Sequence, residues 1–135
     1  MGMNAVYEGA KDCPEAIPLF PLGGALLLPR GQMPLNIFEP RYLAMIDDAL
    51  KAERVIGIIQ PEPETGRQPE IPPLLKVGCL GRITQFSETG DGRYIITLTG
   101  ISRFRLLDEL SVTTPYRQGR VGYDSFAADF AARTG

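Results

Sequence analysis

The chain has 135 residues, a formal net charge of −2 and a 44% share of hydrophobic residues. Length and composition predict one globular domain with a core of its own, and they argue against intrinsic disorder. The 15 glycines and 12 prolines favour a strand-rich domain interrupted by many turns. Because the chain has no histidine, it cannot form a Ser-His-Asp or Cys-His nucleophile or a histidine-ligated metal site.

The cysteines and the charge further limit the class of protein that this chain can be. Cys13 and Cys79 cannot form a four-cysteine zinc site, and we expect two free thiols rather than the one disulfide that the count allows. We expect no metal, no cofactor and no catalytic residue. Residues 1–16 lack the apolar core of a signal peptide, and prolines and glycines interrupt the apolar stretch 17–28. With a pI near 5.2, the composition favours a cytoplasmic protein and argues against binding to a membrane or to nucleic acid.

The first part of the chain is predicted to be a tail followed by short apolar segments. Residues 1–16 show no apolar periodicity and are expected to be a flexible tail. Prolines punctuate 17–22, which predicts an edge or entry strand. Residues 25–28 are expected to be a second short buried segment that ends in a turn at 29–31, and 33–38 to be another strand.

The periodicity predicts one principal helix over residues 40–52. Pro40 suits the first helical position, where its missing N–H is not needed. Apolar side chains then recur at the spacing of one buried helix face, at Tyr42, Met45, Ile46, Ala49 and Leu50.

The remainder of the chain is predicted to be strands and turns. The continuous apolar run 55–59 indicates a central strand buried on both faces, and the five prolines of residues 61–73 indicate a long loop. Further strands are expected over 75–87, 93–98, 104–110 and 116–123, with a hairpin turn at 89–92 and a break at Gly100.

These elements predict a mainly β fold with one principal helix (α+β), arranged as a small, mainly antiparallel barrel of six or seven short strands. The pattern changes at residue 124. Phe126 and Phe130 are four residues apart and would share one side of a helix. We expect residues 124–131 to dock on the barrel or to pair weakly with a second copy of the chain.

Several sequence blocks closely resemble the N-terminal domain of Lon ATP-dependent proteases. They are Leu19-Phe20-Pro21-Leu22, Leu28-Pro29-Arg30-Gly31, Phe38-Glu39-Pro40-Arg41-Tyr42, and Arg103-Phe104 within Gly100–Arg105. The resemblance implies a PUA-like pseudo-barrel over residues 17–123 that helps to capture protein substrates for a downstream ATPase and peptidase. It also implies that residues 124–135 are the start of a truncated C-terminal helical region. No Gly-rich phosphate loop occurs in the sequence, so we expect a binding module and not an enzyme.

Two elements are candidates for contact with polypeptide. One is the apolar material at Leu26, Leu27 and Leu28, for which ordinary core is the alternative. The other is the 61–73 loop with Pro61, Pro63 and Pro69, for which a disordered connector is the alternative. We interpret the Lon-like blocks themselves as mainly structural, with direct substrate contact of the block 38–42 as the alternative.

Three other side-chain groups are weaker candidates. Glu39 with Asp47 or Asp48 is expected to be a solvated face rather than a carboxylate pair, and nothing near Ser87 and Lys76 activates them as a dyad. Arg103 and Arg105, with Arg82 or Arg93, would form a basic patch and make a PUA-like RNA-binding domain the rival function. The favoured function is a non-catalytic module or adaptor in proteolysis, with unfolded or flexible polypeptides and a protease or chaperone as partners.

Overall fold

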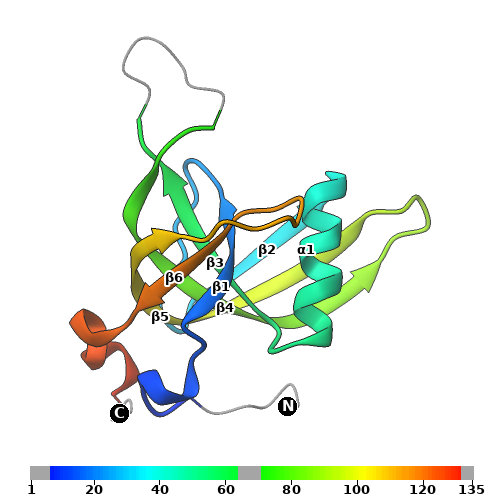
Figure 1. The fold of residues 1–135 in the computed structure, drawn as a ribbon. Helices are drawn as coiled ribbons and strands as arrows, with labels where there is room; N and C mark the ends of the chain where they lie inside the picture. The colour runs from blue at the N-terminus through cyan, green and yellow to red at the C-terminus, as the bar shows by residue number, and fades with distance from the viewer. Residues whose placement is uncertain (1–6, 64–70, 132–135) are drawn as a thin grey trace.

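Figure 1 shows the computed structural model, which describes residues 7–63 and 71–131. It contains six strands, one α-helix and two short 3-10 helices. In chain order they are η1 (Ala10–Asp12), β1 (Ala16–Pro21), β2 (Gln32–Ile37), α1 (Pro40–Lys51), β3 (Val55–Pro61), β4 (Leu74–Glu88), β5 (Tyr94–Glu109), β6 (Gln118–Gly122) and η2 (Asp124–Phe130).

Five of the strands close into a ring in the order β1-β3-β4-β5-β6. The ring closes because β6 pairs with β5 on one side and with β1 on the other. β2 lies outside the ring and pairs with the first half of β5. Among the described strands β1 and β3 form a parallel pair and every other pairing is antiparallel. The prediction of a mainly antiparallel, barrel-like fold is confirmed.

The helix forms where the periodicity predicts it. α1 begins at Pro40 in the first helical position, and its buried side chains are Tyr42, Met45, Ile46 and Ala49. These side chains share one core cluster with residues of β2, β4 and β5, among them Ile37, Ile83 and Ile96. α1 therefore covers the sheet formed by β2 and the adjoining halves of β4 and β5 (Figure 1).

A second core fills the ring of strands. Its centre is Phe104 on β5, which is fully buried among apolar side chains from β1, β3, β4 and β6. Gly57 and Gly78 lie against this ring, and a Cβ at either position would approach the phenyl carbons to 3.0 Å or less. The small size of these two residues lets a large aromatic side chain fill a narrow barrel.

The predicted strand break at Gly100 is wrong. β5 continues through this residue to Glu109. The Gly100 N–H donates to the Gly31 carbonyl at 2.8 Å, and a Cβ at Gly100 would collide with the Leu28 carbonyl oxygen. Glycine is needed here because another stretch of backbone crosses the strand closely, not because the strand ends.

The N-terminal segment differs from the expected tail. Residues 7–15 lie against the barrel, with Cys13 7% exposed and the Tyr123 hydroxyl donating to the Pro14 carbonyl at 2.7 Å. Residues 1–6 of the expected tail lie outside the described residues. Few apolar side chains hold this segment, so periodicity gave no signal for it.

Two loops also differ in detail from the expectations. Residues 25–28 belong to a connection in which Leu27 is buried but Leu26 and Leu28 are exposed, so they do not form a buried segment. The predicted 61–73 loop begins one residue later, because Pro61 belongs to β3, and the Glu62 N–H donates to the Pro73 carbonyl at 2.8 Å where β4 follows. The C-terminal segment is η2, two 3-10 turns with a kink at Phe126, and it docks on β5, one of the two arrangements expected for it.

Candidate functional site

The connection between β1 and β2 exposes large apolar side chains. Leu26 is 72% exposed and Leu28 is 54% exposed, whereas Leu27 between them is buried in the core beside α1. In an extended segment, neighbouring side chains point to opposite sides, so one leucine anchors the connection and two face outward. Exposed apolar side chains that gather together mark a binding surface more often than isolated ones do.

One apolar pocket lies between this connection and the barrel. We call it the β4 pocket; its volume is about 110 Å³. Its lining includes Leu26 and Leu28 of the connection, Val77 of β4 and Arg103 of β5. The Gln60 amide donates to the Ala25 carbonyl at 3.0 Å and fixes the connection over the pocket.

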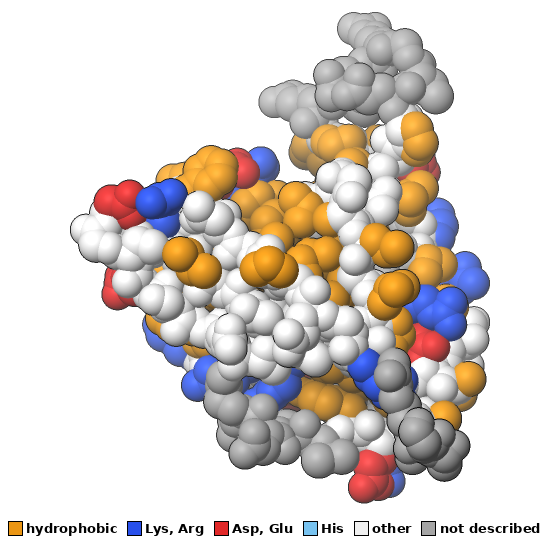
Figure 2. Space-filling model, turned by 180° about the vertical axis from the view of Figure 1, so that it is seen from behind, with side chains coloured by type: hydrophobic (Ala, Val, Ile, Leu, Met, Phe, Trp, Pro, Cys, Tyr) orange, Lys and Arg blue, Asp and Glu red, His pale blue; other side chains and the backbone are white. Residues whose placement is uncertain are grey.

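A second pocket lies where β1 and β2 end and α1 begins. We call it the motif pocket; its volume is about 260 Å³. Two sequence blocks that are far apart in the chain line it, Phe20-Pro21-Leu22 and the stretch from Leu35 to Glu39 with Arg41 and Tyr42. The structure thus brings together two of the blocks that carried the resemblance. Figure 2 shows hydrophobic side chains lining the hollow on this face of the molecule.

The residues of the motif pocket divide into a floor and a rim. Phe20 and Tyr42 form the floor, with ring centroids 4.3 Å apart, and burial raises the pKa of the Tyr42 hydroxyl. Phe38 is 64% exposed and stands at the rim. Glu39 and Arg41 form an ion pair of 3.0 Å beside it, and the Arg41 guanidinium also lies 4.8 Å from the Tyr42 ring centroid. The rim therefore carries one aromatic side chain and a neutralised charge pair.

The remaining predicted site residues are spread over the fold. Leu19 and Phe104 are fully buried in the barrel core, and Pro61 ends β3 opposite Leu74. Pro63 is exposed just beyond that strand. Pro69 lies outside the described residues.

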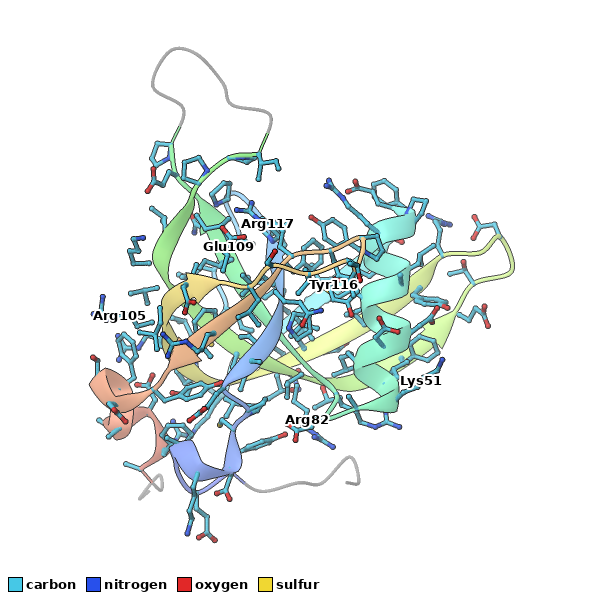
Figure 3. The ribbon with its side chains drawn as sticks, viewed as in Figure 1. Lys51, Arg82, Arg105, Glu109, Tyr116 and Arg117 are labelled. Atoms are coloured by element: carbon cyan, nitrogen blue, oxygen red, sulfur yellow. The ribbon has the colours of Figure 1, made fainter. Side chains whose placement is uncertain are left out.

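The candidate carboxylate pair does not exist as a pair. The Tyr94 hydroxyl donates to Asp47 and the Tyr116 hydroxyl donates to Asp48, each at 2.6 Å. These hydrogen bonds, together with burial, raise the pKa of both tyrosines to about 12. Figure 3 shows Tyr116 turned toward α1, so both carboxylates attach α1 to neighbouring elements.

The candidate dyad of Ser87 and Lys76 also does not assemble. Ser87 and Lys76 are both exposed and lie near opposite ends of β4. Among the described residues no group of three or more Cys, Asp or Glu side chains could hold a metal ion.

The arginines considered as a basic patch serve different parts of the fold. Arg82 is 3% exposed and donates to the Tyr7 hydroxyl at 2.9 Å, Arg93 pairs with Asp91 in a hairpin, and Arg103 pairs with Asp129. Figure 3 shows Arg82 near the end of α1 and Arg105 on a different part of the molecule.

Sequence reasoning missed several pocket residues, among them three apolar side chains. Leu35 and Ile37 line the motif pocket, and Val77, which is 39% exposed, lines the β4 pocket. The alternation of apolar and polar residues over β2 places Leu35 and Ile37 on one face, and this signal was present in the sequence. For Val77 no local signal distinguishes a pocket wall from ordinary strand surface.

Comparison with known proteins agrees with this fold. Residues 16–130 match the family described as the ATP-dependent protease La (LON) substrate-binding domain. The chain belongs to this family. The matched domain is a non-catalytic binding module.

The relatives are much longer proteins. A Lon protease of Anaeromyxobacter dehalogenans (strain 2CP-C) is 30% identical over 116 residues, which are 86% of this chain and 14% of that protein. Lon protease 2 of Myxococcus xanthus is 30% identical over 111 residues, 82% of this chain and 13% of that protein. The chain therefore corresponds to a small part of these relatives.

Two solved structures share the fold. A Lon N-terminal domain protein from Xanthomonas campestris superposes with a TM-score of 0.63 and 28% identity, covering 80% of this chain and 59% of that one. The N-terminal domain of Mycobacterium avium complex Lon protease gives a TM-score of 0.57 at 18% identity, covering 80% and 54%, and it shows the fold alone. In the part of the chain that the structure describes, α1 and the 3-10 helices are all too short or too polar to cross a membrane.

Proposed function

We propose that this domain captures unfolded or loosely folded polypeptide on its apolar surface and presents it for proteolysis, as part of a protease or as an adaptor. The observation that carries the proposal is the exposure of Leu26 and Leu28 at the β4 pocket and of Phe38 at the motif pocket. An unfolded chain exposes the apolar side chains that such pockets would bury. A folded protein keeps most of them inside.

Physical chemistry favours weak and broadly selective binding at such a surface. The hydrophobic effect is non-directional, so pockets of this kind accept many apolar side chains. Burying one Leu or Phe side chain stabilises a complex by about 1.5–3 kcal/mol, but association loses about 4–15 kcal/mol of translational and rotational freedom. Several side chains must therefore engage together, which favours long flexible segments over single residues.

The proposal includes the setting in which the domain works. The partners would be flexible polypeptides and a protease or chaperone, and the location would be the cytoplasm, where two buried free thiols such as Cys13 and Cys79 stay reduced. Weak self-association remains part of this proposal.

Anisotropy of a labelled, permanently unfolded protein, such as reduced and carboxymethylated lactalbumin, tests the function. We expect saturable binding that a Leu26→Ser, Leu28→Ser double variant weakens about tenfold or more. A matched control is the Ile95→Ser, Leu107→Ser double variant, because these side chains are 48% and 47% exposed but line neither pocket.

A salt series separates this function from the RNA-binding rival. Apolar capture should persist as salt rises, whereas binding to a short single-stranded RNA should weaken steeply. Equal loss of lactalbumin binding in both double variants, or tight salt-sensitive RNA binding, would contradict the proposal.

A further inference from the structure

We propose that the free edge of β2 binds the target polypeptide as an added β-strand, with one of its apolar side chains in the motif pocket. This inference rests on the proposed function and specifies it, because it makes an extended backbone the feature that is recognised. Extended peptides bind to exposed sheet edges in several protein families, where main-chain hydrogen bonds supply affinity and pockets supply selectivity.

The position of β2 in the sheet leaves one edge open. The strand order is β2-β5-β4-β3-β1-β6, so β2 ends the series and, within the described residues, pairs with β5 alone. Its register with β5 runs without a bulge from Gln32 opposite Thr99 to Ile37 opposite Tyr94. Gln32, Pro34 and Asn36 are exposed.

The hydrogen bonds define which backbone groups of β2 face this open edge. The Gly100 N–H donates to the Gly31 carbonyl, so Gly31 points toward β5. Backbone groups alternate along a strand, so residues 33, 35 and 37 point toward β5 and residues 32, 34 and 36 point away from it. Thr97 on β5 lies opposite Pro34, and its carbonyl accepts a hydrogen bond from the Thr84 hydroxyl on β4. The backbone groups of this pair therefore point away from each other, as the alternation requires.

The outward groups suit an incoming strand. Pro34 has no N–H, and it occupies an outward position, where a missing donor does not disturb the ladder with β5. Gln32 and Asn36 present an N–H and a carbonyl each, and no hydrogen bond is recorded for these groups within the described residues. The alternating partial charges of this row complement an extended backbone. A helix could not match them, because its own backbone groups are already paired.

The motif pocket lies beside this edge. Its lining comes from β2, the end of β1 and the start of α1, and β5 is not among the elements that line it. Side chains of paired strands stand about 4.5–5.5 Å apart on the same face. Every second side chain of an added strand would therefore lie beside Leu35 and Ile37, within reach of the pocket. Glu39 and Arg41 neutralise each other at the rim, which favours an uncharged side chain there.

Two variants of one residue test the role of the backbone. Gln32→Pro removes an outward N–H and leaves the ladder with β5 intact, as Pro34 already does at the next outward position, whereas Gln32→Ala removes the side chain and keeps the N–H. Gln32 is not among the residues that line the motif pocket. The probe is a labelled synthetic peptide of about nine residues in which Leu or Phe alternates with Ser. We expect Gln32→Pro to weaken binding about five- to tenfold and Gln32→Ala to change it less than about twofold.

A gain of binding provides the complementary test. Pro34→Ala adds an outward N–H in the middle of the edge, and we expect it to strengthen peptide binding about two- to fivefold. Equal affinities of Gln32→Pro, Gln32→Ala and the natural protein would overturn the inference, provided that circular dichroism and thermal unfolding show each variant folded.

Peptides methylated on alternate backbone nitrogens test the same point without changing the protein. Methyl groups on the nitrogens that face β2 block the N–H groups that would bond to it, and they should abolish detectable binding. Methyl groups on the other set of nitrogens, which face away from β2, should be tolerated. Equal effects of both sets would overturn the edge inference while leaving lactalbumin capture, and so the proposed function, in place. Failure of the natural protein to bind either lactalbumin or the unmethylated peptide would overturn both.

Discussion

Arg103 on β5 holds Asp129 of η2 in a two-point contact. The guanidinium donates to both carboxylate oxygens at 3.0 and 2.9 Å, and the Arg103 backbone N–H donates to the same carboxylate at 3.0 Å. The guanidinium also lies 4.7 Å from the centroid of the Phe126 ring. The side chain of Asp129 is only 8% exposed, so this contact fastens the C-terminal segment to the barrel.

Replacing Asp129 by Asn should change how stability depends on pH. Hydrogen bonds from Arg103 lower the pKa of Asp129 below its ordinary value of 3.8. A carboxylate with a lowered pKa in the folded state stabilises the fold above its ordinary pKa, and this stability is lost as pH falls through the lowered pKa. We therefore expect Asp129→Asn to lower the Tm by a few degrees near neutral pH and to lose less further stability on acidification.

Thermal unfolding between pH 7 and pH 2 measures this effect. Asp124→Asn in the same segment is the control, because Asp124 is exposed and its side chain makes no hydrogen bond to the residues that the structure describes. An Asp129→Asn curve parallel to that of the natural protein would mean that the contact contributes nothing to the acid dependence.

Removing the Tyr116 hydroxyl should weaken the attachment of α1. This hydroxyl is buried and donates to Asp48, so Tyr116→Phe is expected to lower the free energy of unfolding by about 1 kcal/mol. Burial and this bond raise the pKa of Tyr116 from 10.0 to about 12. The neutral phenol is thus favoured by folding, and its contribution is present below pH 10 and lost as pH rises toward 12.

Urea unfolding at pH 7 and at several values between pH 9 and pH 12 checks both parts of this expectation. Tyr94→Phe is the matched control, because its hydroxyl makes the same 2.6 Å bond to α1 from a more exposed position. A larger loss of stability in Tyr94→Phe than in Tyr116→Phe would contradict the role of burial.

A methyl group at Gly78 should strain the barrel. Its Cβ would lie 2.5 Å from the Ile58 carbonyl oxygen and 2.6 Å from the Phe104 ring. Backbone and a fully buried ring must then move, so Gly78→Ala is expected to destabilise the fold by about 1–3 kcal/mol. Gly90→Ala, which has no atom within 4 Å of its Cβ, should stay within about 0.5 kcal/mol. Chemical unfolding measures the free energy of unfolding of both variants. Equal values for Gly78→Ala and Gly90→Ala would argue against this packing.

The two thiols should be unreactive until the protein unfolds. Cys13 is 7% exposed and Cys79 is 3% exposed, and burial raises the pKa of each to about 12. Because the thiolate is the reactive form, a disulfide reagent at pH 8 should label both very slowly in the native state. The same reagent in concentrated urea should label both quickly. Rapid labelling of a native thiol would show that its surroundings open locally.

Local patterns in the sequence determined the elements that depend on neighbouring residues alone. α1 begins at Pro40 and buries Tyr42, Met45 and Ile46, because helix periodicity and the fixed backbone angle of proline act over a few residues. The strand at Val55–Ile59 follows from a continuous apolar run in the same way. The Lon-like blocks indicated the family, and with it the barrel.

Tertiary structure alone decided the surface. The spacing of residues in the sequence cannot show that Leu27 turns inward while Leu26 and Leu28 remain exposed. This depends on where β4 and β5 lie beneath the connection. The spacing also cannot show that Phe20 meets Tyr42 in one pocket, because strand pairing brings together segments distant in the chain. Gly100 continues a strand rather than ending it, because the backbone at Leu28 crosses closely and leaves no space for a side chain. Leu28 is too far from Gly100 in the sequence for a local pattern to show this.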